Sequence, residues 1–148
     1  MSYGISTLSI IPCRAEGNDR SEMVTQLLFG EVYEVLEEIE KWINIKIATD
    51  GYECWICRKQ FTEISGKEFE AYKLNQFPLC ADLIGEITNY KGESSTITIG
   101  ATLPFYRKDI FVIQDEKYSF KGAINSKKEA DIVKYSLLYL NAPYLWGG

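Results

Sequence analysis

The chain has 148 residues, a formal net charge of −5 and no histidine. Its length suits one ordinary domain or two small ones, and its apolar and charged fractions of 46% and 25% are those of a globular protein rather than a disordered or fibrous one. Acidic and basic residues are interspersed and no long apolar stretch occurs, so the sequence predicts neither a nucleic-acid partner nor a membrane partner.

The lack of histidine excludes a Ser–His or Cys–His catalytic pair and a histidine-ligated metal site within the chain. The N-terminus lacks the basic and apolar regions of a secretory signal, which predicts a cytoplasmic protein with reduced thiols, or a periplasmic one if a signal was removed. Cys54 and Cys57 lie three apart on a predicted strand and face opposite sides of it, so we expect no metal site. Nothing in the sequence predicts a cofactor.

Short, closely spaced strands in the first half of the chain are typical of a small β-barrel. Residues 4–11 and 31–39 are β-like, and residues 21–29 lead to a turn at Gly30. These segments predict the opening strands of the barrel.

A hairpin follows in the same half. Residues 42–47 form the clearest predicted strand, because isoleucine alternates there with polar and aromatic residues. The Asp50-Gly51 pair predicts a type I′ turn, in which both residues need positive φ. Residues 52–57 form the return strand, and we expect the large Trp55 side chain to join the core.

The second half of the chain repeats the strand size and spacing of the first. Residues 61–77 are less regular and are interpreted as a linker. The predicted strands that follow are residues 79–82, 84–89, 95–99, 102–105, 110–114 and 117–124. Two small barrels in tandem are the most economical interpretation.

A helix is predicted at the C-terminal end. Ser126 and Glu129 have the spacing of a capping box. Four apolar residues then recur on one helical face before Pro143: Ala130, Val133, Leu137 and Leu140. We expect residues 141–148 to open a further domain whose remainder is absent from the chain. In the alternative interpretation, Tyr144 and Trp146 cover the second barrel as an ordered tail.

Four phrases occur along the chain in this order: PCRAE at residues 12–16, RSEMVTQLLFGE at 20–31, DGYECWI at 50–56 and LNAPYLWGG at 140–148. Together they resemble the NlpC/P60 family of cell-wall cysteine peptidases, in the dipeptidyl-peptidase VI-like subgroup with two N-terminal bacterial SH3-like domains. The resemblance implies a mainly β fold with tandem SH3-like barrels at residues 1–62 and 63–125. It also implies that residues 126–148 form a linker helix and the start of a truncated α+β catalytic domain.

The resemblance also implies a function. Such enzymes are γ-D-glutamyl-L-diamino acid endopeptidases acting on peptidoglycan stem peptides (L-Ala-γ-D-Glu-diamino acid) in murein-peptide recycling. The first SH3-like domain is expected to bind the free amino terminus of the substrate, with Glu22 pairing with the ammonium and the Tyr52 hydroxyl holding it. Tyr144 is expected near the nucleophile. The catalytic Cys and His of the family are absent, so the chain alone should be inactive.

Other interpretations of these residues stay open. Glu22 is also typical of a solvated loop residue, and Tyr52 of a cross-strand packing residue. The chain as a whole also fits a non-catalytic tandem SH3-like module that binds a cell-wall peptide or a protein partner.

Overall fold

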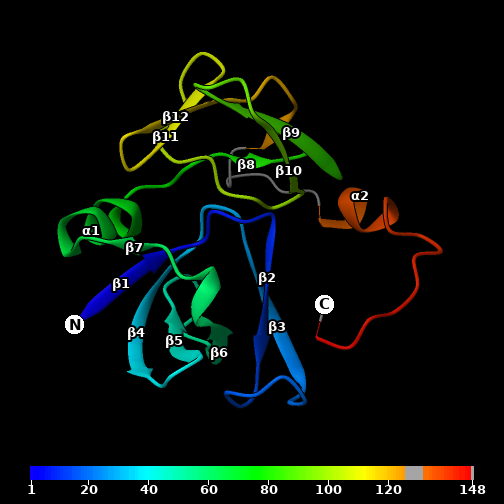
Figure 1. Ribbon diagram of the computed structural model, residues 1–148. Coiled ribbons are helices and arrows are strands. Elements are labelled where there is room, and N and C mark those ends of the chain that lie inside the picture. Colours follow the sequence, from blue (N-terminus) through cyan, green and yellow to red (C-terminus); the bar gives the residue numbers. More distant parts are fainter. Residues whose placement is uncertain (126–131, 148) are drawn as a thin grey trace.

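The computed structural model describes residues 1–125 and 132–147. Two antiparallel β-units follow each other, with helix α1 (Gly66–Leu74) between them at one side (Figure 1). We call residues 2–64 the first β-unit and residues 79–125 the second β-unit. The prediction of a mainly β fold is confirmed.

The first β-unit is a seven-stranded sheet in the order β3-β2-β6-β5-β4-β1-β7. Its strands are β1 (Ser2–Ile5), β2 (Ile10–Arg14), β3 (Met23–Leu28), β4 (Val32–Glu38), β5 (Trp42–Ile47), β6 (Glu53–Cys57) and β7 (Glu63–Ile64). A 3₁₀ turn, η1 (Arg58–Gln60), follows β6.

The predicted strand at residues 4–11 is divided in two. Ser6 is fully buried between β1 and β2, and its backbone groups bond outside the sheet ladder. Its N–H donates to the Glu31 carbonyl at 2.8 Å, and its carbonyl accepts from the Gly30 N–H at 2.8 Å. These two hydrogen bonds satisfy the buried backbone groups of Ser6, although β1 ends at the preceding residue.

The β5–β6 hairpin has the predicted strands but not the predicted turn. Gly51 has φ +76°, whereas Asp50 is not among the residues with positive φ, so the turn is not type I′. The loop is longer: the Gly51 N–H donates to the Ile47 carbonyl and the Ile47 N–H to the Tyr52 carbonyl, both at 2.9 Å. A four-residue loop with a left-handed glycine therefore connects the two strands.

The second β-unit contains a four-stranded sheet in the order β10-β9-β12-β11 and a two-stranded sheet, β13-β8. Its strands are β8 (Leu79–Cys80), β9 (Ile84–Asn89), β10 (Ser94–Thr98), β11 (Ile110–Ile113), β12 (Glu116–Ser119) and β13 (Ile124–Asn125). The strand predicted at residues 102–105 is absent: Thr102 makes only an isolated bridge to Leu79, and Phe105 has φ +55°.

The segment at residues 61–77, interpreted as a linker, contains β7 and helix α1. Ser65 caps α1: its hydroxyl accepts from the Glu68 N–H at 3.2 Å, and the Glu68 carboxylate accepts from the Ser65 N–H at 2.8 Å. The Ser65 hydroxyl also donates to the Glu68 carboxylate at 2.7 Å, and this bond, together with the one from the Ser65 N–H, holds the pKa of Glu68 below its usual range. The helix buries Phe69 and Tyr72, so it is part of the packed structure.

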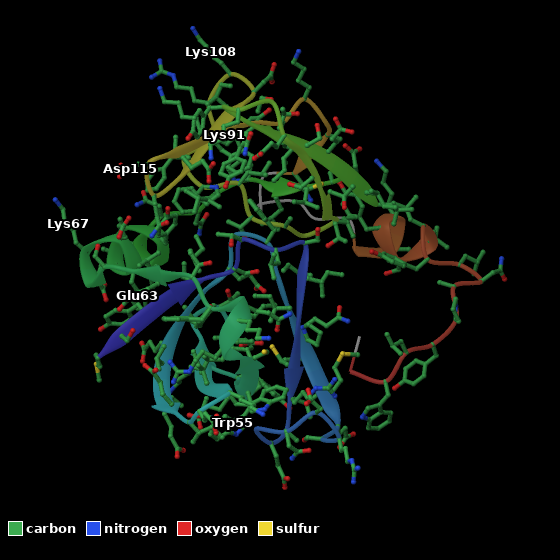
Figure 2. The ribbon with its side chains drawn as sticks, in the orientation of Figure 1. Trp55, Glu63, Lys67, Lys91, Lys108 and Asp115 are labelled. Carbon is green, nitrogen blue, oxygen red and sulfur yellow. The ribbon has the colours of Figure 1, made fainter. Side chains whose placement is uncertain are left out.

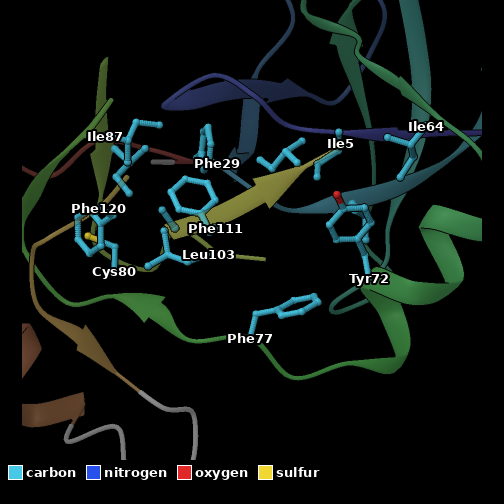
Figure 3. Packing of buried hydrophobic residues seen from close by; sticks show 14 of the residues in the cluster. Ile5, Phe29, Ile64, Tyr72, Phe77, Cys80, Ile87, Leu103, Phe111 and Phe120 are labelled. Carbon is cyan, nitrogen blue, oxygen red and sulfur yellow. The ribbon is translucent and has the colours of Figure 1, made fainter. Parts of the chain in front are cut away.

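The buried side chains form two clusters. One lies within the first β-unit and includes Ile11, Cys13, Tyr33 and Ile45. The other crosses between the two units (Figure 3). It takes these residues from the first unit and α1: Ile5, Phe29, Val32, Ile64, Phe69 and Tyr72. It takes these from the second unit: Cys80, Ile87, Ile97, Ala101, Leu103, Phe111, Ile113 and Phe120. The two units therefore share one core.

Helix α2 (Ile132–Leu137) ends before Leu140, the last residue of the predicted apolar face. After Leu137 the chain continues in turns bonded three residues back, and Asn141 has φ +71°, so the helix ends before Pro143. The predicted capping box and Ala130 lie outside the described residues. The domain boundaries predicted near residues 62 and 125 stay predictions. Within the described ranges, no helix has the length and apolar character needed to cross a membrane.

Candidate functional site

Two of the three predicted site residues lie at the same end of the first sheet. A row of paired residues, Met23, Arg14 and Trp55, crosses β3, β2 and β6. Strands β3 and β6 are both antiparallel to β2, so they start at the same end of the sheet. Glu22 precedes Met23 by one residue and Tyr52 precedes Trp55 by three, which brings both to that end.

Glu22 is held by the loop that joins β2 to β3. Its carbonyl accepts from the Ala15 N–H at 2.9 Å, and the Ser21 carbonyl accepts from Arg14 Nη1 at 2.7 Å. The Ser21 hydroxyl accepts from the Glu16 N–H at 2.8 Å. These bonds fix the backbone on both sides of Glu22. Its side chain is exposed and has no hydrogen bond or ion pair within the described part of the chain, so its carboxylate is available to a ligand.

Tyr52 follows the β5–β6 loop, and its N–H donates to Asp50 Oδ1 at 2.9 Å. It lies on the same side of β6 as the buried Cys54, but past the end of the packed core, and is 45% exposed. Its hydroxyl meets no hydrogen-bond partner among residues 1–125 and 132–147. Both predicted recognition groups therefore face solvent.

The C-terminal segment approaches this end of the sheet (Figure 1). A Cβ built at Gly147 would lie 1.9 Å from the Met23 carbonyl oxygen and 3.1 Å from the Val24 nitrogen, so the Gly147 backbone is in close contact with the edge of β3. Tyr144 is 82% exposed, and its ring meets the Trp146 ring edge-on at 6.3 Å. The structure therefore brings Gly147 beside Met23, next to Glu22, and carries Tyr144 on the segment that makes this contact.

This contact is sensitive to the side chain at residue 147. Replacing Gly147 with alanine places a methyl group against the Met23 carbonyl and requires an L-residue at φ +73°. We expect the segment around Trp146 to leave β3, which increases the acrylamide quenching of Trp146 fluorescence in a background with phenylalanine at Trp42 and Trp55. The global free energy of unfolding should change by less than about 1 kcal/mol, because the segment is peripheral. Unchanged quenching would contradict the contact.

The cysteines do not supply a reactive thiol at this end of the sheet. Cys54 is buried, and a hydrogen bond with the Cys13 thiol, together with burial, raises the pKa of Cys54 well above its usual range. Cys54 therefore stays protonated and unreactive. The described residues contain no group of three or more Cys, Asp or Glu side chains arranged to hold a metal ion.

Two features were not predicted from the sequence. The contact between Gly147 and Met23 joins residues far apart in the chain, and no local sequence pattern predicts it. Trp55, expected in the core, is half-buried on the outer face of the sheet, opposite Cys54 and Ile56. The alternation of side chains along β6 could have predicted the outward position of Trp55, since Cys54 and Ile56 fill the inward positions.

Comparison with known proteins gives the fold a context. Residues 13–61 match the sequence model of the bacterial dipeptidyl-peptidase SH3 domain. The crystal structure of an NlpC/P60 family protein from Bacillus cereus is similar over 99% of this chain and 66% of that one, with a TM-score of 0.74 and 18% identity. NlpC2 from Trichomonas vaginalis aligns over 99% of this chain and 58% of that one, at 14% identity and a TM-score of 0.35, too low to support an argument. No curated protein matches the chain.

The chain therefore contains an SH3 domain of the bacterial dipeptidyl-peptidase type, and it shares its fold with an NlpC/P60 family protein. It spans 66% of the length of that protein. The part of the first β-unit that carries Glu22 and Tyr52 lies within the matched residues.

Proposed function

We propose that this chain is the N-terminal substrate-recognition region of a γ-D-glutamyl-L-diamino acid endopeptidase acting on peptidoglycan stem peptides. The dipeptidyl-peptidase type of the SH3 domain at residues 13–61 and the shared fold with an NlpC/P60 protein support a region associated with a cell-wall peptidase. The finer proposal is that the first β-unit binds the free amino terminus of L-Ala-γ-D-Glu peptides.

One observation carries this proposal: Glu22 and Tyr52 lie at the same end of the first sheet, and the segment bearing Tyr144 returns to it. An ammonium group between them would meet a carboxylate and a phenol hydroxyl, both unpaired within the described residues. A charge-assisted hydrogen bond to each would recognise an amine and discriminate against an acylated nitrogen, which has lost its charge and two donors.

Because the Glu22 carboxylate and the Tyr52 hydroxyl are exposed, tight binding of an ammonium would require a further part of the protein to enclose the site. An exposed ion pair stabilises a complex by only about 0–1 kcal/mol, because water and salt screen it. Partial enclosure strengthens the same pair. We therefore propose that a catalytic domain following the chain closes the site. The large apolar side chains of the C-terminal segment are the proposed contact with that domain: Val133, Leu137, Leu138, Leu140, Leu145 and Trp146, each at least 47% exposed.

The proposed parent enzyme is a cysteine peptidase. A thiolate attacks the γ-D-Glu carbonyl, the bond to the diamino acid breaks and its amine leaves, and water then hydrolyses the acyl-enzyme. This chain contains no histidine to activate a cysteine, and its Cys54 thiol has a raised pKa. Its proposed part is to bind and orient the substrate amino terminus. We expect it to cleave no peptide by itself.

The test replaces Glu22 with glutamine in a protein that also carries the catalytic domain. The measurement is the affinity, by isothermal titration calorimetry, for L-Ala-γ-D-Glu-L-Lys and for its N-acetylated form. Loss of a charged hydrogen bond in a partly enclosed site should weaken binding of the free-amine peptide roughly tenfold. Binding of the acetylated peptide, already weak, should not change.

Glu37→Gln is the matched control, because Glu37 is an exposed carboxylate on β4 of the same β-unit. It should leave both affinities within about twofold. Equal losses on the free and acetylated peptides with Glu22→Gln would contradict recognition of the ammonium by Glu22.

A non-catalytic binding module is the second candidate, and the absence of histidine is the observation that favours it. The same titration separates the two candidates. Binding of L-Ala-γ-D-Glu-L-Lys by this chain alone, with an affinity equal to that of the longer protein, supports a self-sufficient module. Binding that requires the further domain supports a site shared between domains.

A further inference from the structure

The outer face of the first β-unit carries a second, smaller layer of packing. Trp55 pairs with Arg14 and Asn44 across the sheet, and Trp42 pairs with Cys57 two residues further along the strands, on the same face. Trp42 is only 8% exposed, although it lies on this outer face. The β2–β3 loop covers the face, since a Cβ built at Gly17 would lie 3.0–3.2 Å from side-chain atoms of Ile39, Trp55 and Trp42. The β2–β3 loop therefore packs against the side chains of both tryptophans.

Two adjoining hollows open beside this layer, with volumes of about 350 and 460 Å³. Both are lined by Asp19, Trp42, Cys57 and Lys59. One extends to Pro12, Arg14 and Gln60, and the other to Glu40, Lys41 and Arg58. We call this pair of hollows the outer groove. Its size is in the range of sites that hold small ligands or short peptides.

The outer groove is basic, although the chain as a whole has a net charge of −5. Arg58 is occupied by an ion pair with Glu38 at 2.8 Å, and Arg14 by its bond to the Ser21 carbonyl. The ammonium groups of Lys41 and Lys59 have no hydrogen bond or ion pair with any residue that the structure describes. Two cations are therefore available beside a tryptophan floor.

The mixture of groups in the groove favours a peptide over a simple anion. Lys41 and Lys59 can each bind a carboxylate, and Trp42 offers an apolar surface for a side chain. The carboxylates of Asp19 and Glu40 can accept hydrogen bonds from peptide N–H groups, and the amide of Gln60 can donate to and accept from a peptide backbone. Inorganic phosphate has neither an apolar part nor a peptide backbone, so it cannot use the Trp42 surface or the hydrogen-bonding groups of Asp19, Glu40 and Gln60 in the same way.

We propose that the outer groove is a second binding site, which holds a short acidic peptide through the ammonium groups of Lys41 and Lys59. It needs no free amine on the ligand, so it is independent of the proposed amino-terminus site at Glu22 and Tyr52. The two sites can therefore bind different ligands, and either site can exist without the other.

The test uses an N-acetylated triglutamate amide, which has no free amine and three carboxylates, titrated into the chain by calorimetry at low ionic strength. The probe should bind, and binding should weaken as salt is added. N-acetylated triglutamine amide and inorganic phosphate should bind at least tenfold more weakly. The Lys41→Glu/Lys59→Glu variant should weaken binding of the triglutamate probe at least tenfold, because both cations are inverted.

The matched control is Lys67→Glu/Lys91→Glu, which changes the net charge equally on exposed lysines of α1 and the second β-unit. Figure 2 shows both far from Trp55. This control should change the triglutamate affinity less than twofold. Equal losses in the two double variants would overturn the proposal, because the protein would then respond only to net charge. Equal binding of the triglutamine or phosphate probes would also overturn it.

Cys57 supplies an independent measurement within the groove. It lines both hollows and is partly exposed, whereas Cys13, Cys54 and Cys80 are at most 1% exposed. Iodoacetamide should therefore modify Cys57 first, as peptide mapping by mass spectrometry would show. Saturating triglutamate probe should slow this modification severalfold. An unchanged rate at saturation would mean that the probe binds elsewhere, which would also overturn the proposal.

Discussion

Replacing Phe29 with alanine should lower the free energy of unfolding by about 3–5 kcal/mol, the usual cost of truncating a buried aromatic residue. Phe29 follows β3 in the first β-unit but packs in the second: its ring meets Phe111 at 5.8 Å and Tyr118 at 6.0 Å, both edge-on. It is 1% exposed. The cavity left by alanine would open in the cluster that both units share, so both units should lose stability together (Figure 3).

Urea unfolding followed by two signals tests this prediction. With Trp146 replaced by phenylalanine throughout, the fluorescence of Trp42 and Trp55 reports on the first β-unit, because the second β-unit has no tryptophan. Far-UV circular dichroism reports on both units. The two transitions should coincide in the wild type and in Phe29→Ala, as for one cooperative unit. Tyr90→Ala is the control, since Tyr90 is 68% exposed, and should change stability by less than about 0.5 kcal/mol. Two separate transitions would contradict a shared core.

Replacing Gly30 with alanine should destabilise the protein by about 3 kcal/mol, and replacing Gly92 by only about 1 kcal/mol. Both glycines have nearly the same backbone conformation, with φ +81° and +82°. They differ in surroundings: a Cβ at Gly30 would lie 2.2 Å from the Thr102 carbonyl oxygen, whereas a Cβ at Gly92 would meet nothing within 4 Å. The difference in destabilisation between the two variants therefore measures the cost of the clash between the new methyl group and the Thr102 backbone.

The Gly30 contact also joins the two β-units. The Thr102 N–H donates to the Phe29 carbonyl at 2.8 Å, beside the predicted clash. A methyl group at residue 30 should weaken this bond as the two backbones separate. Chemical denaturation of both variants measures the effect, and hydrogen exchange at the Thr102 N–H should accelerate only in Gly30→Ala. Equal destabilisation by the two substitutions would show that the backbone conformation alone requires glycine.

The parts of the fold that could be predicted are those in which local alternation and burial agree. The bounds of β5 (Trp42–Ile47) and β9 (Ile84–Asn89) are those predicted, because each strand has one buried face that fixes its pattern. Helix α1 was missed because only Phe69 and Tyr72 are buried along it, which gives little apolar periodicity. Its capping box, Ser65 with Glu68, was the available signal.

The candidate site could be predicted from the sequence only in part. The residue types at Glu22 and Tyr52 came from the resemblance to a family, and their place at one end of the sheet follows from strand pairing. No local pattern in the sequence could show that residue 147 lies beside Met23, because this contact depends on the paths of α2 and the turns after it. The roles of Glu22, Tyr52 and Tyr144 stay predictions.

The two hydrophobic clusters also set an order of events during synthesis. The cluster inside the first β-unit is complete once residues up to Ile56 have left the ribosome. The shared cluster waits for Phe120, so Ile5, Phe29 and Val32 stay uncovered while the intervening residues are made. At about 5–20 residues per second this interval lasts roughly 3–13 seconds. During that time the nascent chain exposes an apolar surface, formed by Ile5, Phe29 and Val32, that the complete structure buries.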